Sequence, residues 1–362
     1  MIPLLNRLRH NKRQKKRGYC QHMADSTLEM RNPLSGESEM KKTVRHALES
    51  ISLPVAVYLI FLILIPRRFG NINCIRTIFM QSIVPTITAY AVAFGNICGL
   101  FDFSIGSEQI IAGVVGGTMA AKFGIPGMII GALLAALIVT AITGTLNSLL
   151  KIPSLVLTMG LTMIYEIVGS KLAGHYGFVQ IDTKHAIFGS GVNIILIFIF
   201  SAVLFYFLFY HTVFSYNLKA VGSNETVAKN SGIPVNLVKF KAFVYGGIFL
   251  SISAILTLSQ SGSVGAQQSL GSVTIFFKPL ISILLALVIQ NICNLAAGIF
   301  IAQFTLNIIF IGLIAAGLPD TFQNVVLGLF LLLVMILFEN TERISAWKEK
   351  KAVARRAAQE TA

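Results

Sequence analysis

Charged side chains are scarce in this sequence. Aspartate, glutamate, lysine and arginine make up only 12% of the 362 residues, whereas 55% of the residues are hydrophobic. Soluble domains usually carry about 25% charged residues. The scarcity of charge therefore excludes an ordinary soluble enzyme, and the mean hydropathy of +0.75 agrees with that exclusion.

Signals for chemistry and for secretion are also missing. The cysteines Cys20, Cys74, Cys98 and Cys293 do not have the spacing of a metal site and are expected to be small apolar residues. The chain has no G-x-x-x-x-G-K-[ST] phosphate loop. We therefore expect no catalytic residue, no bound cofactor and no metal. Residues 1–45 lack the apolar run of a cleavable signal peptide, so the first apolar span is expected to act as a signal anchor.

Long apolar runs are present throughout the middle of the chain. Each run lies in a segment of about 20 residues, which is long enough to cross a bilayer as a helix. The sequence thus predicts an all-α polytopic membrane protein. About ten transmembrane helices are expected, at 48–66, 76–97, 104–121, 125–149, 153–172, 192–212, 236–259, 275–292, 297–316 and 322–340. Pro279 and the polar residues near 290–294 predict a short or broken helix within 275–318.

The positive charge is concentrated at the two ends of the chain. Of the 29 lysines and arginines, 11 precede residue 46 and 6 follow residue 342. Basic segments next to membrane spans mark the cytoplasmic side and attract anionic lipids. We expect a disordered cytoplasmic tail at 1–47, a transmembrane domain at 48–340 and a basic cytoplasmic tail at 341–362. Arg67, Arg68 and Arg76 would lie outside and oppose this orientation, but they are outnumbered.

A role in nucleic-acid binding is not expected for the basic N-terminal run. The run Arg7 to Arg17 lacks interleaved aromatic residues and any recognisable binding fold. A segment that sets membrane topology is the favoured interpretation.

The loop at 213–235 is predicted to be cytoplasmic and to contain a short helix, whereas the other long loop, 173–191, is predicted to be external. Ser223 or Asn224 is placed to cap the helix, and Glu225 in its first turn complements the helix dipole. Gly232 is placed to end it, with Pro234 just beyond. A docking helix and a capped loop helix without a partner both fit these features.

Two carboxylates, Asp102 and Glu108, lie in the stretch G-L-F-D-F-S-I-G-S-E at 99–108, which is otherwise free of charge. A charge at the centre of a membrane helix costs about 2.5–3.5 kcal/mol even on insertion scales. The favoured interpretation is that Asp102 or Ser104 caps the following helix. Two alternatives remain open, namely a lining of the substrate path and a proton relay or cation site. Glu166 is open to the same interpretations.

Amide side chains in the spans are candidates for a polar path. Buried amides also join helices through hydrogen bonds worth about 0.6 kcal/mol on average, which is the favoured interpretation for any single one. The amides in question are Asn147, Gln290, Asn291, Asn294, Gln303 and Asn307.

The loop sequence A-V-G-S-N-E-T-V-A-K-N-S-G-I at 220–233 resembles the cytoplasmic coupling loop of permease subunits of ribose-type simple-sugar ABC importers. In that family a short helix of this loop docks in a groove of the ATPase subunit. The resemblance implies an ATPase-coupling role for the residues that match the family pattern, which are Gly222, Asn224, Glu225, Ala228, Ser231 and Gly232.

Three other segments resemble the same family, and together the similarity covers roughly residues 50–340. Residues 99–107 are similar to the family sequence G-G-I-D-L-S-V-G-S, and Thr143–Gly160 and Gln260–Gly271 are similar to two further segments. The chain departs from the family at Leu287–Asn294, where a glycine-rich stretch is replaced by a sequence with three amides. This departure puts the local backbone shape and the substrate in doubt.

The resemblance implies an ABC importer permease fold in a bacterial plasma membrane, with both termini in the cytoplasm. It implies a cytoplasmic ATPase that binds ATP and Mg, an extracellular or periplasmic substrate-binding protein, and a second permease copy in a homo- or heterodimer. A ribose-like pentose or similar sugar is the expected substrate, with a nucleoside or branched-chain amino acid as alternatives. Candidate path or gate residues are Asp102, Ser104, Glu108, Asn147, Gln290 and Asn291.

Two other classes of function remain open. The first is a proton- or sodium-coupled secondary transporter that uses Asp102 and Glu108. The second is a membrane scaffold without transport activity, which the polar path and the coupling loop disfavour.

Overall fold

The computed structural model describes residues 51–150, 152–290 and 293–339, which belong to one compact unit. The predicted tails at 1–47 and 341–362 lie outside the described residues, as does Asn291.

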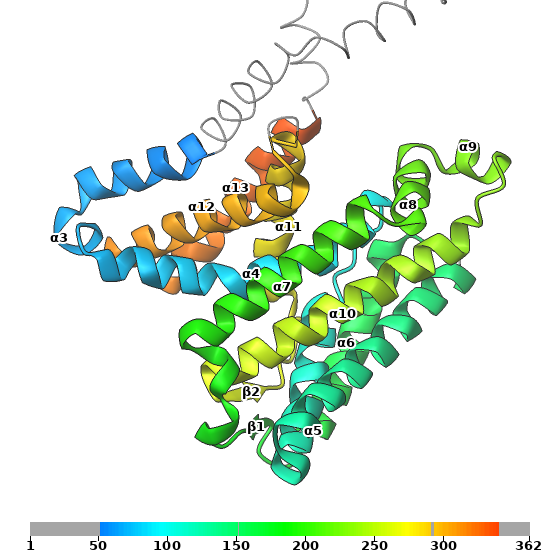
Figure 1. Ribbon diagram of the computed structural model, residues 1–362, viewed down its shortest axis with the longest axis horizontal. Helices are drawn as coiled ribbons and strands as arrows, with labels where there is room; N and C mark the ends of the chain where they lie inside the picture. Colours follow the sequence, from blue (N-terminus) through cyan, green and yellow to red (C-terminus); the bar gives the residue numbers. More distant parts are fainter. Residues whose placement is uncertain (1–50, 151, 291–292, 340–362) are drawn as a thin grey trace, which may run out of the picture. The chain divides into compact units, whose positions relative to one another are not determined.

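The described residues are mainly helical, which confirms the predicted all-α polytopic class (Figure 1). An apolar helix at Ile51–Leu64 comes first. The other helices are α3 (Pro66–Phe69), α4 (Ile72–Ile97), α5 (Ile105–Leu150), α6 (Ser154–Leu172), α7 (Gly191–Tyr210), α8 (Val213–Ser223), α9 (Glu225–Asn230), α10 (Val235–Ser261), α11 (Val273–Val288), α12 (Leu295–Ala315) and α13 (Asp320–Glu339). Within the described part, 6 helices are long and apolar enough to cross a membrane, namely α4, α5, α6, α7, α10 and α12. The number of ten membrane-spanning helices stays a prediction.

Two predicted interruptions of the apolar runs are present. Gly124, with φ +66° and ψ −151°, divides α5 between the spans predicted at 104–121 and 125–149. Only glycine adopts this backbone conformation readily. The predicted short helix within 275–318 is α11, which has 16 residues with Pro279 inside it and ends before the polar residues near 290–294.

Short strands join the two loops at one end of the helices. The strands β1 (Phe178–Gln180) and β2 (Ser263–Gly265) pair antiparallel, with Val179 opposite Val264. The remainder of the predicted external loop forms the 3₁₀ turns η1 (Thr183–His185) and η2 (Ile187–Gly189). Figure 1 shows β1 and β2 at one end of the bundle, with α8 and α9 at the other.

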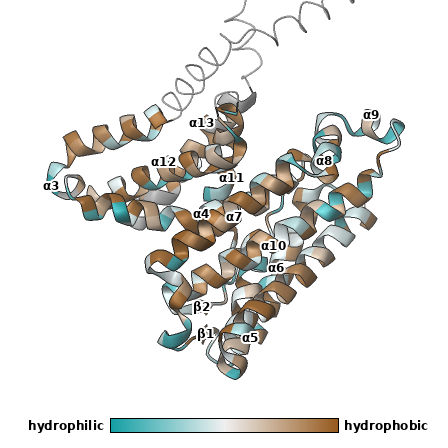
Figure 2. Ribbon diagram, viewed as in Figure 1, coloured by the Kyte–Doolittle hydropathy of each residue, from teal (hydrophilic) through white to brown (hydrophobic). Residues whose placement is uncertain are grey.

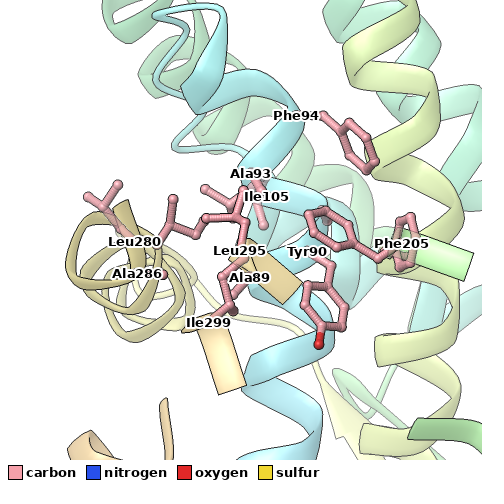
Figure 3. Packing of buried hydrophobic residues seen from close by; sticks show 14 of the residues in the cluster. Ala89, Tyr90, Ala93, Phe94, Ile105, Phe205, Leu280, Ala286, Leu295 and Ile299 are labelled. Atoms are coloured by element: carbon pink, nitrogen blue, oxygen red, sulfur yellow. The ribbon is translucent and has the colours of Figure 1, made fainter. Parts of the chain in front are cut away.

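An aromatic cluster fills the space between α4, α7 and α10. Tyr90 of α4 stacks on Phe205 of α7 with ring centroids 4.4 Å apart, and Phe205 stacks on Phe209 at 5.4 Å. Phe94 and Phe249 complete the cluster with tilted or edge contacts, and Figure 3 shows Tyr90, Phe94 and Phe205 close together. Because lipid tails are as apolar as these rings, close packing rather than removal from water stabilises the cluster.

Apolar side chains also cover much of the outer surface of the helices. Ile138 of α5, Val203 of α7 and Leu329 of α13 are all exposed, and Figure 2 shows hydrophobic residues along these helices. Such a surface fits a lipid environment, because a soluble protein of this size rarely exposes long apolar patches.

Glycine allows two helices to approach closely at the start of α5. A Cβ atom built on Gly106 would lie 1.9 Å from the carbonyl oxygen of Ser272, the residue before α11. Any side chain at position 106 would therefore push α11 away from α5.

The aromatic cluster predicts different effects for two phenylalanines of α7. Phe205→Ala removes a fully buried ring, and Phe→Ala changes in protein cores cost about 3–5 kcal/mol. We expect a clear loss of thermal stability of the detergent-purified protein, measured by the unfolding of its far-UV circular dichroism signal. Phe207, which is 57% exposed on the same helix, provides the matched control. An equal loss of stability in Phe207→Ala would contradict the packing assigned to Phe205.

Candidate coupling and translocation sites

The loop at 213–235 contains two helices where one was predicted. No helix was predicted from the sequence for residues 213–223, which form α8, capped by Thr212. Leu218 and Val221 of α8 are buried against the transmembrane helices, and an apolar face of this kind provides the stability that a short helix lacks on its own. The predicted short helix is α9, of 6 residues.

Local hydrogen bonds fix both ends of α9. Asn224 is the N-cap, and its Oδ1 accepts the amide of Val227 at 3.0 Å. Gly232 has φ +84° and donates its amide to Lys229 O, while Ile233 donates to Ala228 O. This is the Schellman arrangement, which needs a residue that tolerates positive φ. Asn224 and Gly232 therefore set the start and the end of α9.

One side of α9 is anchored and the other is open. Ala228 is buried, whereas Val227 is 59% exposed. Ser231 is exposed, and its hydroxyl donates to Val227 O. Glu225 forms an ion pair with Lys239 of α10 at 2.8 Å, and the Glu225 side chain is 57% exposed. The short helix thus presents an exposed face with both apolar and polar groups, which a partner protein can contact.

Gly222 connects α8 to the end of α4. A Cβ built on Gly222 would lie 1.9 Å from the carbonyl oxygen of Ile97, so the two backbones are in direct contact. Cys98 lies beside the same contact, with its Sγ 3.8 Å from Leu218 O. A displacement of α8 must therefore also displace the end of α4, because close-packed elements transmit strain.

Asp102 and Glu108 are joined by the hydroxyl group of Ser104. Asp102 Oδ1 accepts the amide of Ser104 at 2.9 Å and also the Ser104 hydroxyl. The same hydroxyl lies 3.1 Å from Glu108 Oε1. Both carboxylates are buried, and Glu108 is 0% exposed. Three of the predicted path residues are thus brought together at the start of α5.

The polar cluster continues from Glu108 into α6. Thr143 donates to Glu108 Oε1 at 2.6 Å, and its hydroxyl lies 3.0 Å from the Tyr165 hydroxyl. Among the described residues, Glu108 Oε2 has no hydrogen-bond partner. A cavity of about 20 Å³ beside it is lined by Asp102, Glu108 and Thr140 together with apolar residues. This is room for about one water molecule and too small for a sugar.

Asp102 caps the start of α5 as predicted, but the amide that it binds belongs to the residue before the helix. Asp102 accepts the amide of Ser104, which precedes α5, and so stabilises the turn that leads into the helix. Glu108 lies in the first turn, where the positive end of the helix dipole favours a carboxylate. These positions give both acidic groups a structural role in an apolar part of the protein.

Glu166 performs a similar task at the start of α11. Its Oε1 accepts the amide of Ser272 at 2.9 Å and the Ser272 hydroxyl at 2.7 Å, and its Oε2 accepts the amide of Leu270 at 2.9 Å. Ser269 and Leu270 both have positive φ, at 56° and 64°. Such conformations persist in residues other than glycine when surrounding contacts hold them. The Glu166 carboxylate supplies those contacts.

A larger cavity lies at the end of the bundle that carries α8. It has a volume of about 900 Å³, and Gly222 and Gln290 are among its lining residues. Lys219 also lines it, with Nζ 3.3 Å from Phe209 O and above the rings of Phe209 and Tyr210. Burial lowers the pKa of Lys219. The cavity is large enough for a simple sugar.

The remaining predicted amides fall into two groups. Asn147 is nearly buried, and its Nδ2 has no partner among the described residues. Gln303 contacts the Ser282 hydroxyl and lies 3.5 Å from Asn307, which donates to Ser82 at 2.9 Å. Gln303 and Asn307 therefore join α4, α11 and α12, as the favoured interpretation of buried amides predicted.

Neither Tyr165, which belongs to the polar cluster, nor Lys278 of α11 was singled out from the sequence. Tyr165 extends the polar cluster, and its partner Thr143 is 22 residues away in the sequence. Lys278 lies in the middle of the apolar helix α11, and a single charge within an apolar run was the available signal.

The sequence profile of the family described as branched-chain amino acid transport system / permease component matches residues 74–335. The D-allose transport system permease protein of Escherichia coli (strain K12) is 26% identical over 59% of this chain and 67% of its own length. The galactofuranose transporter permease protein of the same organism is 24% identical over 66% of this chain and 72% of its own length. The fructose import permease protein of Rhizobium meliloti is 20% identical over 90% of this chain and 95% of its own length. No solved structure matches the chain.

Two substitutions of Asp102 test the structural role of its hydrogen bond to the Ser104 amide. Asp102→Asn keeps an oxygen that accepts the Ser104 amide, so we expect thermal stability close to that of the unchanged protein. Asp102→Ala removes the acceptor, and a lost buried hydrogen bond of this kind costs about 1 kcal/mol or more. Thermal unfolding in detergent checks both expectations. A loss of stability in Asp102→Asn as large as that in Asp102→Ala would contradict the hydrogen-bonding role.

Proposed function

Because this chain belongs to the family of branched-chain amino acid transport system permease components, we propose that it imports a simple sugar, ribose-like or similar, driven by a separate ATPase. The names of three relatives refer to D-allose, galactofuranose and fructose, which favours a sugar over an amino acid as the substrate. The observation that carries the coupling part of the proposal is the geometry of α9. This helix is rigidly capped, anchored through Ala228 and exposed on its other side.

The proposed coupling passes from α9 through α8 to the transmembrane helices. An ATPase that binds ATP and Mg contacts the exposed face of α9 in the cytoplasm. Its closure moves α9 and α8, and the contact of Gly222 with Ile97 moves the end of α4. Tyr90 of α4 donates to Ala296 O of α12 at 3.0 Å, so the displacement reaches a second transmembrane helix. Two discrete arrangements of these helices would open the path to one side and then to the other.

The cavity of about 900 Å³ supports the proposal that the α8 end of the bundle faces the cytoplasm. It adjoins α8, and we propose that it is the cytoplasmic end of the substrate path. An extracellular or periplasmic binding protein delivers the sugar at the opposite end, where β1 and β2 lie. A second permease copy completes the transporter in the bacterial plasma membrane, with both termini in the cytoplasm.

The environment of the acidic residues favours an ATP-driven importer over a proton- or sodium-coupled transporter. Asp102 and Glu166 bind amides that precede α5 and α11, and Glu108 lies at the positive end of α5. The cavity beside Asp102 and Glu108 has room for about one water molecule, and Thr140 supplies the third oxygen-bearing side chain of its lining, which does not favour a sodium site.

Replacement of Glu225 by tryptophan tests the coupling. Glu225→Trp places a bulky group on the exposed face of α9, so we expect ATP-dependent uptake of a panel of radiolabelled sugars to fall at least about tenfold, which corresponds to about 1.4 kcal/mol. Uptake is measured in vesicles that contain the permease, its ATPase and its binding protein. The amount of permease in the membrane should not change.

Val203→Trp is the matched control. Val203 is 62% exposed, but it lies within the transmembrane helix α7, away from both ends of the bundle. We expect this variant to retain ATP-driven uptake. Normal uptake in Glu225→Trp would contradict a coupling role for α9.

A further inference from the structure

Lys278 is a cation in an apolar helix and has no anionic partner within residues 51–150, 152–290 and 293–339. Among the residues that the structure describes, the ion pairs are Lys184 with Asp182 and Lys239 with Glu225. The only interaction of the Lys278 ammonium group within this part of the chain is with the ring of Phe310, whose centroid is 4.3 Å from Nζ. The attraction to one aromatic ring is smaller than the cost of placing a charge within the membrane.

The position of Lys278 in α11 keeps its charge away from both ends of the helical bundle. Lys278 is ten residues before the end of α11 at Val288, which is about 15 Å along a helix. The start of α11 also lies inside the bundle, because Ser272 is fully buried and binds Glu166 of α6. The side chains of lysines near helix ends extend to the membrane surface, but Lys278 is too far from the end of its helix to do so.

A stripe of polar side chains, those of Gln267 and Thr274, precedes Lys278 along the chain. Gln267 is exposed, and its Oε1 lies 3.0 Å from the Cβ position of Gly271. The carbonyl oxygen of Gly271 accepts the hydroxyl of Thr274 at 2.8 Å. Thr274 is exposed and precedes Lys278 by four residues, so both side chains lie on one face of α11.

This stripe is not a surface that lipid tails can cover. The backbone before α11 is irregular, with positive φ at Ser269 and Leu270. Irregular backbone occurs at membrane depth only where it faces protein or a water-filled space. An amide, a hydroxyl and an ammonium group in a row match a ligand that has hydroxyl groups and one negative charge.

We propose that Lys278, together with Thr274 and Gln267, binds the anionic group of a sugar acid or sugar phosphate in the translocation path. This inference rests on the proposed sugar import and names the chemical class of the substrate. The ammonium group pairs with the carboxylate or phosphate, and the amide and hydroxyl groups bind the sugar hydroxyls.

Cysteine labelling tests this site in the full chain. The cysteines Cys20, Cys74, Cys98 and Cys293 are replaced by serine, and Thr274→Cys provides one reactive thiol beside Lys278. The protein in lipid nanodiscs is treated with a water-soluble thiosulfonate that carries a negative sulfonate. The measurement is repeated in the Lys278→Met and Lys278→Arg backgrounds, and with D-ribose, D-gluconate, D-ribose 5-phosphate or inorganic phosphate as protecting compounds.

We expect the thiol to react with the thiosulfonate from water. The reaction rate should be on the order of tenfold higher in the protein with Lys278 or Lys278→Arg than in the Lys278→Met variant. D-gluconate or D-ribose 5-phosphate should slow the reaction when the cation is present, and the more protective of the two identifies a carboxylate or a phosphate. Retained reactivity in the arginine variant shows that the charge, rather than folding, makes the difference.

Three results would overturn the proposal. The first is a thiol that does not react from water, and the second is protection by D-gluconate and D-ribose 5-phosphate that is no stronger with the cation than without it. The third is protection by inorganic phosphate as strong as by the anionic sugars. Each of these results leaves the coupling role of α9 intact, because that role is tested separately through Glu225.

Discussion

The contact between Gly106 and the carbonyl oxygen of Ser272 brings together the starts of α5 and α11 inside the protein. A helix start carries free amides and partial positive charge, which neither lipid nor apolar side chains can satisfy. Three carboxylates lie at these two points. Asp102 binds the turn before α5, Glu108 lies in its first turn, and Glu166 binds the segment before α11. The presence of three buried carboxylates in an apolar part of the protein therefore follows from two helices that begin away from water.

The same constraint organises the coupling end of the molecule. The turn between α4 and α5 includes Asp102, and α4 ends at Ile97, which contacts Gly222. A motion of α8 therefore reaches a segment whose conformation is fixed by buried hydrogen bonds. Because such a segment has few alternative conformations, a displacement moves whole helices instead of being absorbed in a flexible loop. This is the physical basis for proposing that a six-residue helix controls a path through the membrane.

Local patterns in the sequence predicted much of the structure. The helical class, the division of α5 near residue 124 and the cap of α9 at Asn224 follow from hydrophobic runs, glycine and capping chemistry, which depend on neighbouring residues. Glu166 was open to the interpretation as a helix cap, but the helix start that it binds was not predicted, because its partner Ser272 is 106 residues away. Helix α8 was missed because buried contacts of Leu218 and Val221 stabilise it, and the local sequence does not reveal those contacts.

The central claim is that α9 is the surface on which a cytoplasmic ATPase docks, and protection of one thiol tests it most directly. Val227→Cys places a thiol on the exposed face of α9 in a chain without its native cysteines, and Tyr176→Cys, at a side chain that is 80% exposed near β1, is the control. Both variants are treated with a membrane-impermeant maleimide in detergent, with and without the ATPase. The account predicts that the ATPase blocks labelling at position 227 and leaves position 176 reactive. Equal labelling at position 227 with and without a bound ATPase would contradict it.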